Sequence, residues 1–136
     1  MIFQKEIVLP KFSQGFHLIT DIIENEIENM PQNGLLNVFV KHTSAGITIN
    51  ENADISVRID FQSILNKLVP ENQPFYTHIF EGDDDMPAHI KTSLFGNSIS
   101  IPITGKKLNL GTWQGIYFCE FRKRAGARKL VLTVIY

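Results

Sequence analysis

Hydrophobic and polar positions alternate along several short segments of this chain, a pattern typical of half-buried strands. Leu36, Val38 and Val40 lie two residues apart, and residues 47–51 repeat the same alternation. Because a Thr-Ser-Ala-Gly turn signal at 43–46 separates the two segments, we predict that they form a hairpin. The other predicted strands cover residues 3–9, 16–19, 75–80, 98–103, 107–109, 113–122 and 129–136.

Capping signals mark the start of two short helices. Asp21, with Glu24 three residues later, forms a capping-box pattern ahead of residues 22–29. Asp85 is expected to cap a second short helix, which Gly96 ends. Both helices are therefore expected to be only two or three turns long.

The longest predicted helix starts at a cap formed by Asp54 or Ser56 and stops before Pro70. Its apolar positions fall on one helical stripe: Val57, Phe61, Ile64, Leu65 and Leu68. Hairpin strands with helices set apart from them predict an α+β fold, a mostly antiparallel β-sandwich with a few short helices.

Composition limits the classes of function. The 136 residues fit one domain, residues 1–136. The formal net charge of −1 provides no extended field for nucleic acid or an anionic membrane, so we expect neither partner. The lone cysteine, Cys119, excludes an intrachain disulfide and is expected to pack as a small hydrophobe. No signal peptide or membrane-length apolar stretch is present, so we expect a cytoplasmic protein.

Three histidines adjoin a predicted turn, strand end or helix start, where functional sites are usually assembled. His42 extends the inward face of its strand, His78 lies within residues 75–80, and His89 follows Asp85 by four residues. Each also has a structural interpretation: a backbone hydrogen bond, a cross-strand polar pair and a local pair with Asp85, respectively. Three neutral imidazoles that leave an open coordination position would suit a catalytic metal.

Acidic residues supply a second candidate metal site. Asp83, Asp84 and Asp85 are consecutive, so their side chains cannot all point inward. Asp83 and Asp84 are candidate ligands for magnesium, which prefers oxygen, and a solvated acidic turn is the competing interpretation. Glu51 is expected to lie roughly 13 Å from His42 across the predicted hairpin, so the two should not share a site within one chain.

Two further segments fit the binding of a phosphate or a flat ring. Trp113 lies between Gly111 and Gly115, and glycines allow a ligand to approach the backbone closely. Packing of Trp113 in the core is the alternative. Arg122 opens the basic segment 122–129, which is either a solvated hairpin end or a phosphate clamp.

These motifs resemble the YjbQ-like family, the secondary thiamine-phosphate synthases. The matching segments, in family order, are residues 42–46, 50–54, 76–78, 82–85, 88–91, 93–96, 101–103 and 110–116. The tryptophan segment is the most specific of them, and the histidine segments come next. Asp85 departs from the asparagine often found in related sequences, which leaves its role open.

The resemblance implies a homotrimer built around a β-sandwich. It implies that His42, His78 and His89 converge, together with a divalent metal (magnesium or zinc), near a subunit interface. It also implies a secondary thiamine-phosphate synthase activity, which joins hydroxymethylpyrimidine diphosphate to thiazole phosphate and releases pyrophosphate. The expected partner is thus a small phosphorylated metabolite.

Set against that reaction, the catalytic candidates are the three histidines and Ser44, which lies beside His42 in the turn. Lys91 or Arg122 would meet the leaving phosphate, because a departing diphosphate needs its negative charge stabilised. Asp83 and Asp84 would hold the metal.

Aromatic side chains are the candidates for binding the pyrimidine ring. Trp113 or Tyr76 would stack on it, and Thr112 and Gln114 complete the expected substrate-binding set. Two other classes of function remain open: a metal-dependent hydrolase of a small phosphorylated or acyl substrate, and a non-catalytic metabolite-binding protein.

Overall fold

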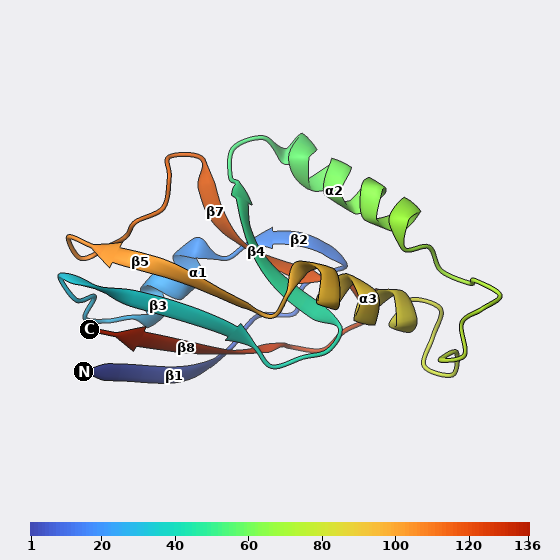
Figure 1. Cartoon of the computed structure of the whole chain (residues 1–136), viewed down its shortest axis with the longest axis horizontal. Helices are drawn as coiled ribbons and strands as arrows, with labels where there is room; N and C mark the ends of the chain where they lie inside the picture. Colours follow the sequence, from blue (N-terminus) through green and yellow to red (C-terminus); the bar gives the residue numbers. More distant parts are fainter.

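The larger of two antiparallel sheets has five strands in the order β1-β8-β3-β5-β6 (Figure 1). This computed structural model describes residues 1–136. The alternation at Leu36, Val38 and Val40 forms a strand whose register pairs Val38 with Ile99 on one side and Leu132 on the other. The bounds are β1 (Ile2–Val8), β3 (Asn33–Val40), β5 (Ser98–Thr104), β6 (Lys107–Leu108) and β8 (Lys129–Ile135).

The smaller sheet has three strands in the order β2-β7-β4. Its strands are β2 (Gly15–Leu18), β4 (Ala45–Glu51) and β7 (Gln114–Glu120). Antiparallel register pairs the first residue of β4 with Glu120 and its last residue with Gln114. The two ends of β4 are therefore well separated, by roughly 20 Å for a strand of this length.

Inward-facing residues of both sheets form one core, and the predicted α+β sandwich is confirmed. Val38 and Leu132 of the larger sheet and Ile47 and Phe118 of the smaller sheet are fully buried in it. Ile23 of α1 (Thr20–Glu26) joins the same core. In β3, therefore, the alternating apolar positions Leu36, Val38 and Val40 are the buried ones.

Helices α2 (Ile55–Leu68) and α3 (Asp85–Phe95) pack on the outer face of the smaller sheet (Figure 1). A second core between them and the sheet contains Phe16, Leu65, Ala88, Tyr117, Cys119 and Phe121. Burial raises the pKa of the Cys119 thiol well above its ordinary value, as expected for a packed hydrophobe. No helix is both long enough and apolar enough to cross a membrane.

The C-terminal end of α3 is fixed against β4. The amide of Ile47 donates to the carbonyl of Gly96 across 3.1 Å. Gly96, as predicted, ends the helix, and its φ of +89° is one that side-chain-bearing residues rarely adopt. A Cβ on Gly46 would lie 3.0 Å from the same carbonyl, a tight contact, so this close approach favours glycine.

The predicted hairpin between β3 and β4 is wrong. The two strands belong to different sheets, and residues 41–44 cross from one layer of the sandwich to the other. A turn signal marks where a strand ends, but it does not determine which strand the next one pairs with.

Residues 75–80 do not form the predicted strand. They run irregularly between α2 and α3, and Phe75, Ile79 and Phe80 are exposed. Apolar and aromatic residues favour a strand only where a neighbouring strand satisfies the backbone and a core takes up the side chains. Neither is present here.

The helix starts agree with the sequence in one case of three. Asp54 caps α2 as predicted, because its carboxylate accepts the amide of Ser56 at 2.9 Å. Asp21 and Asp85 were expected to be N-caps, but both lie inside the first turn of their helices. The hydroxyl of Thr20, the first residue of α1, accepts a hydrogen bond from the backbone amide of Ile116.

Candidate functional site

Three side chains bring metal-ligating atoms together at the start of α3. The Nε2 atom of His78 lies 2.6 Å from Oδ2 of Asp85, and Nε2 of His89 lies 3.1 Å from the same oxygen. The ligand atoms of these three side chains all lie within 4.8 Å of one another, and Oε2 of Glu81 lies 3.2 Å from Nε2 of His78. We call the three side chains the histidine–aspartate cluster.

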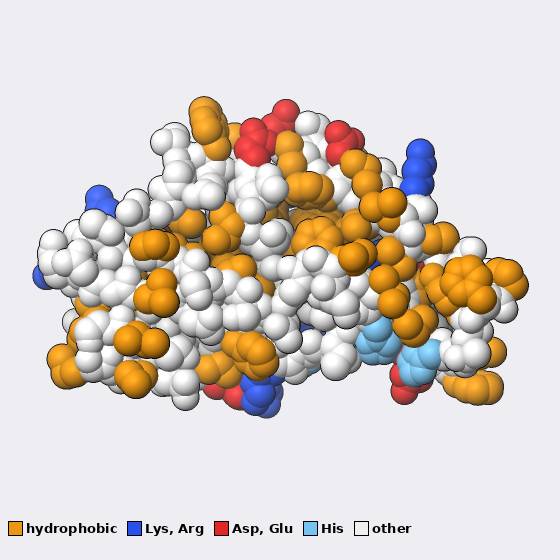
Figure 2. Space-filling model, in the orientation of Figure 1, with side chains coloured by type: hydrophobic (Ala, Val, Ile, Leu, Met, Phe, Trp, Pro, Cys, Tyr) orange, Lys and Arg blue, Asp and Glu red, His pale blue; other side chains and the backbone are white.

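Local structure explains how the cluster forms. Asp85 is the first residue of α3 and His89 lies one turn later, so both side chains lie on one helix face. His78 comes from the irregular segment before α3. The side chain of Asp85 is 2% exposed, whereas those of His78 and His89 are 45% and 31% exposed. The exposure of the two imidazoles means that the cluster opens to solvent, and Figure 2 shows histidine side chains at the surface next to apolar ones.

Arg122 holds the carboxylates around this cluster. Its Nη1 donates to Oδ1 of Asp85, and its Nε donates to Oδ2 of Asp84 at 3.1 Å. Its Nη2 donates to the carbonyl of Glu81 at 2.8 Å. The guanidinium therefore fixes one oxygen of Asp85 and leaves the other to the histidines.

The charges around Asp85 keep it ionised. Burial acts to raise the pKa of this carboxyl, but the hydrogen bonds with His78 and Glu81 and the charges of His89 and Arg122 outweigh burial and lower it. At neutral pH the cluster thus contains a carboxylate that is almost inaccessible to solvent and is oriented by an arginine.

A backbone hydrogen bond decides which nitrogen of His89 faces Asp85. Nδ1 of His89 lies 2.9 Å from the carbonyl oxygen of Thr43. Because a carbonyl only accepts, Nδ1 carries a proton; Nε2 donates to the carboxylate when the ring is protonated, and a neutral ring would present a lone pair to it. Such a contact is favourable only with a proton or a metal cation between the two atoms.

The donor set fits a transition metal better than magnesium. Two imidazole nitrogens and one carboxylate oxygen suit zinc and its neighbours, whereas magnesium prefers a set made of oxygens. The hydrogen bond from Nδ1 of His89 to Thr43 also follows the usual arrangement of a metal-ligating histidine.

His42 lies outside this cluster, in a separate group that we call the Glu120–Arg128 network: His42, Ser44, Glu120 and Arg128. Arg128 donates to the two carboxylate oxygens of Glu120 at 2.7 and 2.6 Å and to Oγ of Ser44 at 3.0 Å. Nε2 of His42 accepts the amide of Lys129 at 2.8 Å. The three histidines predicted to converge are thus divided into a pair and one member of this network.

The environment of His42 favours its neutral form. Burial lowers the pKa of this imidazole, and the positive charge of Arg128 lowers it further. A neutral ring with a free lone pair on Nε2 is the form that accepts a backbone amide, as observed.

The other residues proposed for metal or phosphate lie apart from the cluster or are engaged elsewhere. Asp83 is exposed, and Oδ2 of Asp84 accepts both Arg122 and the amide of Lys123. Lys91 is 3% exposed, and its Nζ donates to Oδ1 of Asn66 at 3.1 Å. Burial lowers the pKa of Lys91.

The tryptophan segment lies at the opposite end of β4. Trp113 precedes β7 and is 64% exposed, so it does not pack in the core. Oε1 of Gln114 accepts the amide of Gly111 at 2.8 Å, which closes the turn on which Thr112 and Trp113 lie. Thr43, which contacts the cluster, comes just before the other end of β4. Within one chain, therefore, these candidates do not share a site with the cluster.

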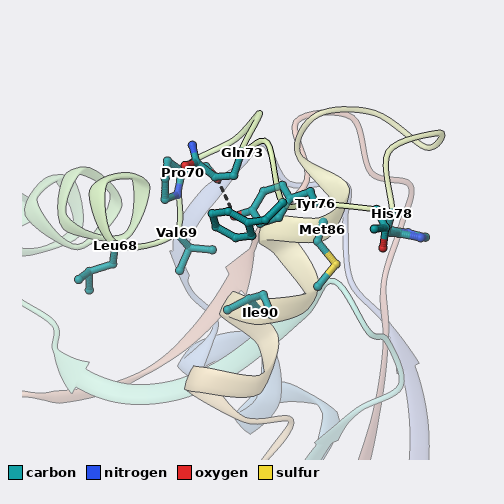
Figure 3. A pocket seen from close by; sticks show the side chains of 10 residues that line it. Leu68, Val69, Pro70, Gln73, Tyr76, His78, Met86 and Ile90 are labelled. Atoms are coloured by element: carbon teal, nitrogen blue, oxygen red, sulfur yellow. Dashed lines mark hydrogen bonds between the residues drawn. The ribbon is translucent and has the colours of Figure 1, made fainter.

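An apolar hollow of about 510 Å³ begins at His78. Figure 3 shows Val69, Tyr76 and Ile90 around it, with the imidazole of His78 directed away from Leu68 at the far end. The phenol of Tyr76 donates to the carbonyl of Pro70 at 2.8 Å, which leaves its ring as part of the wall. The hollow and the cluster thus meet at the backbone of His78.

Sequence reasoning did not select Asp85 as a metal ligand. It assigned Asp85 to capping and, as a structural alternative, to a local pair with His89, and it selected the neighbours Asp83 and Asp84 as metal ligands. The signal for its true position was present, because Asp85 and His89 have the spacing of side chains that meet on a helix. Arg122 as the partner of Asp85 was not predictable, since 37 residues separate the two.

Comparisons with known proteins agree in placing the chain. A family model described as "UPF0047 protein YjbQ-like" matches residues 5–136. The UPF0047 protein YjbQ of Salmonella typhimurium is 45% identical over 136 residues, covering 98% of each chain. A UPF0047 protein of Methanocaldococcus jannaschii is 46% identical over 121 residues, covering 89% of this chain and 85% of that one.

Solved structures show the same fold. A crystal structure of an uncharacterized conserved protein of the YjbQ/UPF0047 family from Clostridium acetobutylicum is similar with a TM-score of 0.85 and 42% identity, covering 96% of this chain and 99% of that one. A conserved hypothetical protein from Thermus thermophilus has a TM-score of 0.82 and 31% identity, covering 94% and 97%. The chain therefore belongs to the UPF0047, or YjbQ-like, family.

Proposed function

We propose that the histidine–aspartate cluster binds a divalent transition metal and that this protein is a metal-dependent enzyme acting on a small phosphorylated metabolite. One observation carries the proposal: two imidazole nitrogens converge on a single oxygen of a buried carboxylate. Nε2 of His78 also lies 3.2 Å from Oε2 of Glu81, so two carboxylates approach this nitrogen. His78 and His89 share one oxygen of Asp85 and remain partly exposed.

The reaction we propose is the one that the family resemblance implies, thiamine-phosphate synthesis. In it a C–N bond forms between the pyrimidine methylene carbon and the thiazole nitrogen, the C–O bond to the diphosphate breaks, and pyrophosphate leaves with the electron pair. A divalent cation bound at the cluster would stabilise the negative charge that develops on the departing oxygen. His78, Asp85 and His89 would hold that cation.

The side chains near the cluster support the proposal that a bound cation, rather than an arginine or a lysine, stabilises the leaving diphosphate. Arg122 is committed to Asp84 and Asp85, and the ammonium of Lys91 is buried against Asn66. Neither is free to meet a diphosphate in the observed arrangement. The apolar hollow beside His78, whose wall includes the ring of Tyr76, would take the flat part of the substrate.

A second candidate is hydrolysis of a small phosphorylated or acyl substrate. The exposure of His78 and His89 favours it, because a transferase that uses a reactive intermediate must exclude water from its site. Both candidate reactions use the same cluster, and they differ only in the acceptor of the transferred group, which is the thiazole nitrogen in synthesis and water in hydrolysis. A third outcome, binding without turnover, would leave the cluster as a site that only holds a ligand.

The test is an assay of purified, zinc-loaded and magnesium-loaded protein with both phosphorylated precursors and with each alone. Synthesis predicts thiamine phosphate and pyrophosphate in equal amounts, and only when both precursors are present. Hydrolysis predicts phosphate or pyrophosphate from one precursor alone. His89→Ala should abolish either activity, whereas His17→Gln, a matched change at a histidine outside the cluster, should not. Equal turnover by wild type and His89→Ala would sink the proposal.

We also propose that the protein assembles as a homotrimer. The support is exposed apolar surface: Leu68 and Phe75, which line the hollow, are 68% and 74% exposed, and Phe80 is 94% exposed; contiguous exposed apolar surface marks interaction sites. An assembly would also give the distant Trp113 segment of one copy a route to the cluster of another. A monomer in sedimentation equilibrium would contradict this assembly.

A further inference from the structure

A groove of about 370 Å³ runs between β2 and the first half of α2, on the side of the molecule where α2 covers the smaller sheet. Its walls include Gln14, Phe16 and His17 from the β2 side and Ile55, Arg58 and Ile59 from the helix. It shares no lining residue with the hollow beside His78. The groove is therefore separate from the site described above.

Arg58 is the one formally charged residue in this groove, since no acidic or lysine side chain lines it. Nε of Arg58 donates to the phenol oxygen of Tyr117 at 3.1 Å, and its guanidinium carbon lies 5.6 Å from the centre of the Tyr117 ring. Because Tyr117 is fully buried, these two contacts hold the guanidinium in one place.

The terminal nitrogens of Arg58 have no partner in the protein. Arg122 and Arg128 direct their guanidinium groups at carboxylates, but Arg58 has no ion pair and makes no hydrogen bond beyond the one to Tyr117. Four N–H bonds are thus left in the fork geometry that matches an oxyanion. A half-buried, oriented and unpaired arginine is unusual, because ordinary surface arginines are mobile.

The other walls restrict what fits beside Arg58. Nε2 of Gln14 donates to the carbonyl of Phe121, and Nε2 of His17 is engaged with the carbonyl of Ser13. Ile55 and Ile59, which are 64% and 58% exposed, extend the groove as an apolar strip. The groove therefore offers one positive charge and an apolar surface next to it.

We propose that this groove binds a small monocarboxylate with a short apolar tail. The carboxylate lies against the terminal nitrogens of Arg58, and the tail covers Ile55 and Ile59. A monoanion matches the single charge of the groove, whereas a phosphate monoester brings close to two negative charges and would leave one of them unpaired. The proposal is independent of the metal cluster and of the reaction proposed for it.

The test is a titration of the isotope-labelled full chain with sodium hexanoate, followed by backbone amide shifts, with hexanol and hexyl phosphate as comparison probes. Hexanoate should produce saturable shifts confined to residues 14–17 and 55–63, at millimolar or lower concentration. Hexanol should bind at least about tenfold more weakly, because it lacks the charge-assisted hydrogen bonds. Hexyl phosphate should bind more weakly than hexanoate.

Variants separate the charge from the apolar contact. Arg58→Gln should weaken hexanoate binding about tenfold or more, and Arg58→Lys should fall between it and wild type because it keeps the charge but loses the fork. Arg124→Gln, at an exposed arginine elsewhere, should bind as wild type does. The probe comparison on wild type stands even if Arg58→Gln fails to fold. Absence of saturable shifts with hexanoate, equal binding of hexanol, or tighter binding of hexyl phosphate would overturn the proposal.

Discussion

Two polar groups lie close to the turn at Thr43 and Ser44, and they differ in how far the chain satisfies them. In the Glu120–Arg128 network, both carboxylate oxygens of Glu120 accept from Arg128, and Glu120 is completely buried. In the histidine–aspartate cluster, His78 and His89 compete for one oxygen of Asp85 and remain partly exposed. The first group is closed within the protein, and the second has coordination capacity left over.

This difference gives each group its role. The buried pair of Glu120 and Arg128 is satisfied within the protein, so it stabilises the fold and offers little to a ligand, whereas an open cluster with spare coordination capacity is where a ligand gains most. Residue type alone does not separate the two, since each contains a histidine and a carboxylate beside an arginine. The following predictions test the separation, from the largest expected effect to the smallest.

Breaking the closed network should have the largest effect on stability. Glu120→Ala leaves the charge of Arg128 buried without a partner, which should lower the free energy of unfolding by about 3–5 kcal/mol. Urea denaturation measures this. Glu6→Ala, which removes an exposed carboxylate paired with Lys41, is the matched control and should change the free energy of unfolding far less, because solvent screens that pair. Similar losses in the two variants would show that the network is not the stabilising group.

Loosening the open cluster should instead reduce affinity for metal. Arg122→Gln removes the group that orients Asp85, so zinc affinity should fall about 10–100-fold. Calorimetric titration of zinc measures the change, and circular dichroism confirms that the variant folds. Arg124→Gln again serves as control. A folded Arg122→Gln protein with wild-type affinity would mean that Asp85 needs no support from Arg122.

Removing His42 should change stability and its pH dependence but not metal binding. Because the folded state lowers the pKa of His42, the unfolded chain binds more protons below the ordinary value of 6.5, and stability is lost as pH falls through that region. His42→Ala should flatten this dependence and cost about 1 kcal/mol near neutral pH, because the amide of Lys129 loses its acceptor. Unfolding curves at several pH values measure both. Identical pH profiles would contradict a half-buried, neutral His42.

The smallest effect is expected at Lys91. Its buried ammonium has one hydrogen bond, so Lys91→Met should leave the free energy of unfolding within about 1 kcal/mol of wild type or raise it slightly. Asn66 keeps a second donor, Gln62, at 3.4 Å. Thermal denaturation checks the stability. A large loss of turnover in a folded, stable variant would instead restore Lys91 to the substrate-binding set.

The features that the sequence predicted correctly depend on near neighbours, although the caps expected at Asp21 and Asp85, also local signals, were misplaced. The cap at Asp54, the helix end at Gly96 and the alternation at Leu36, Val38 and Val40 each depend on residues a few positions away, and each was confirmed. The strand predicted at 75–80 and the hairpin between β3 and β4 depended on partners far along the chain, and both were wrong.

The candidate site shows the same limit. The family resemblance implied that all three histidines converge; His78 and His89 lie together, whereas His42 does not join them. The position of Lys129, 87 residues away, decides that the lone pair of His42 is used inside the protein. Sequence separation of this size leaves no local trace, so the division of the histidines required the structure.

The most direct test of the central claim is zinc stoichiometry by elemental analysis, in wild type and in four single variants purified in parallel. We predict about one zinc per chain in wild type and in His42→Ala, and almost none in His78→Ala, Asp85→Asn and His89→Ala. No zinc in wild type under saturating conditions would contradict the account. So would zinc retained by the three cluster variants and lost from His42→Ala.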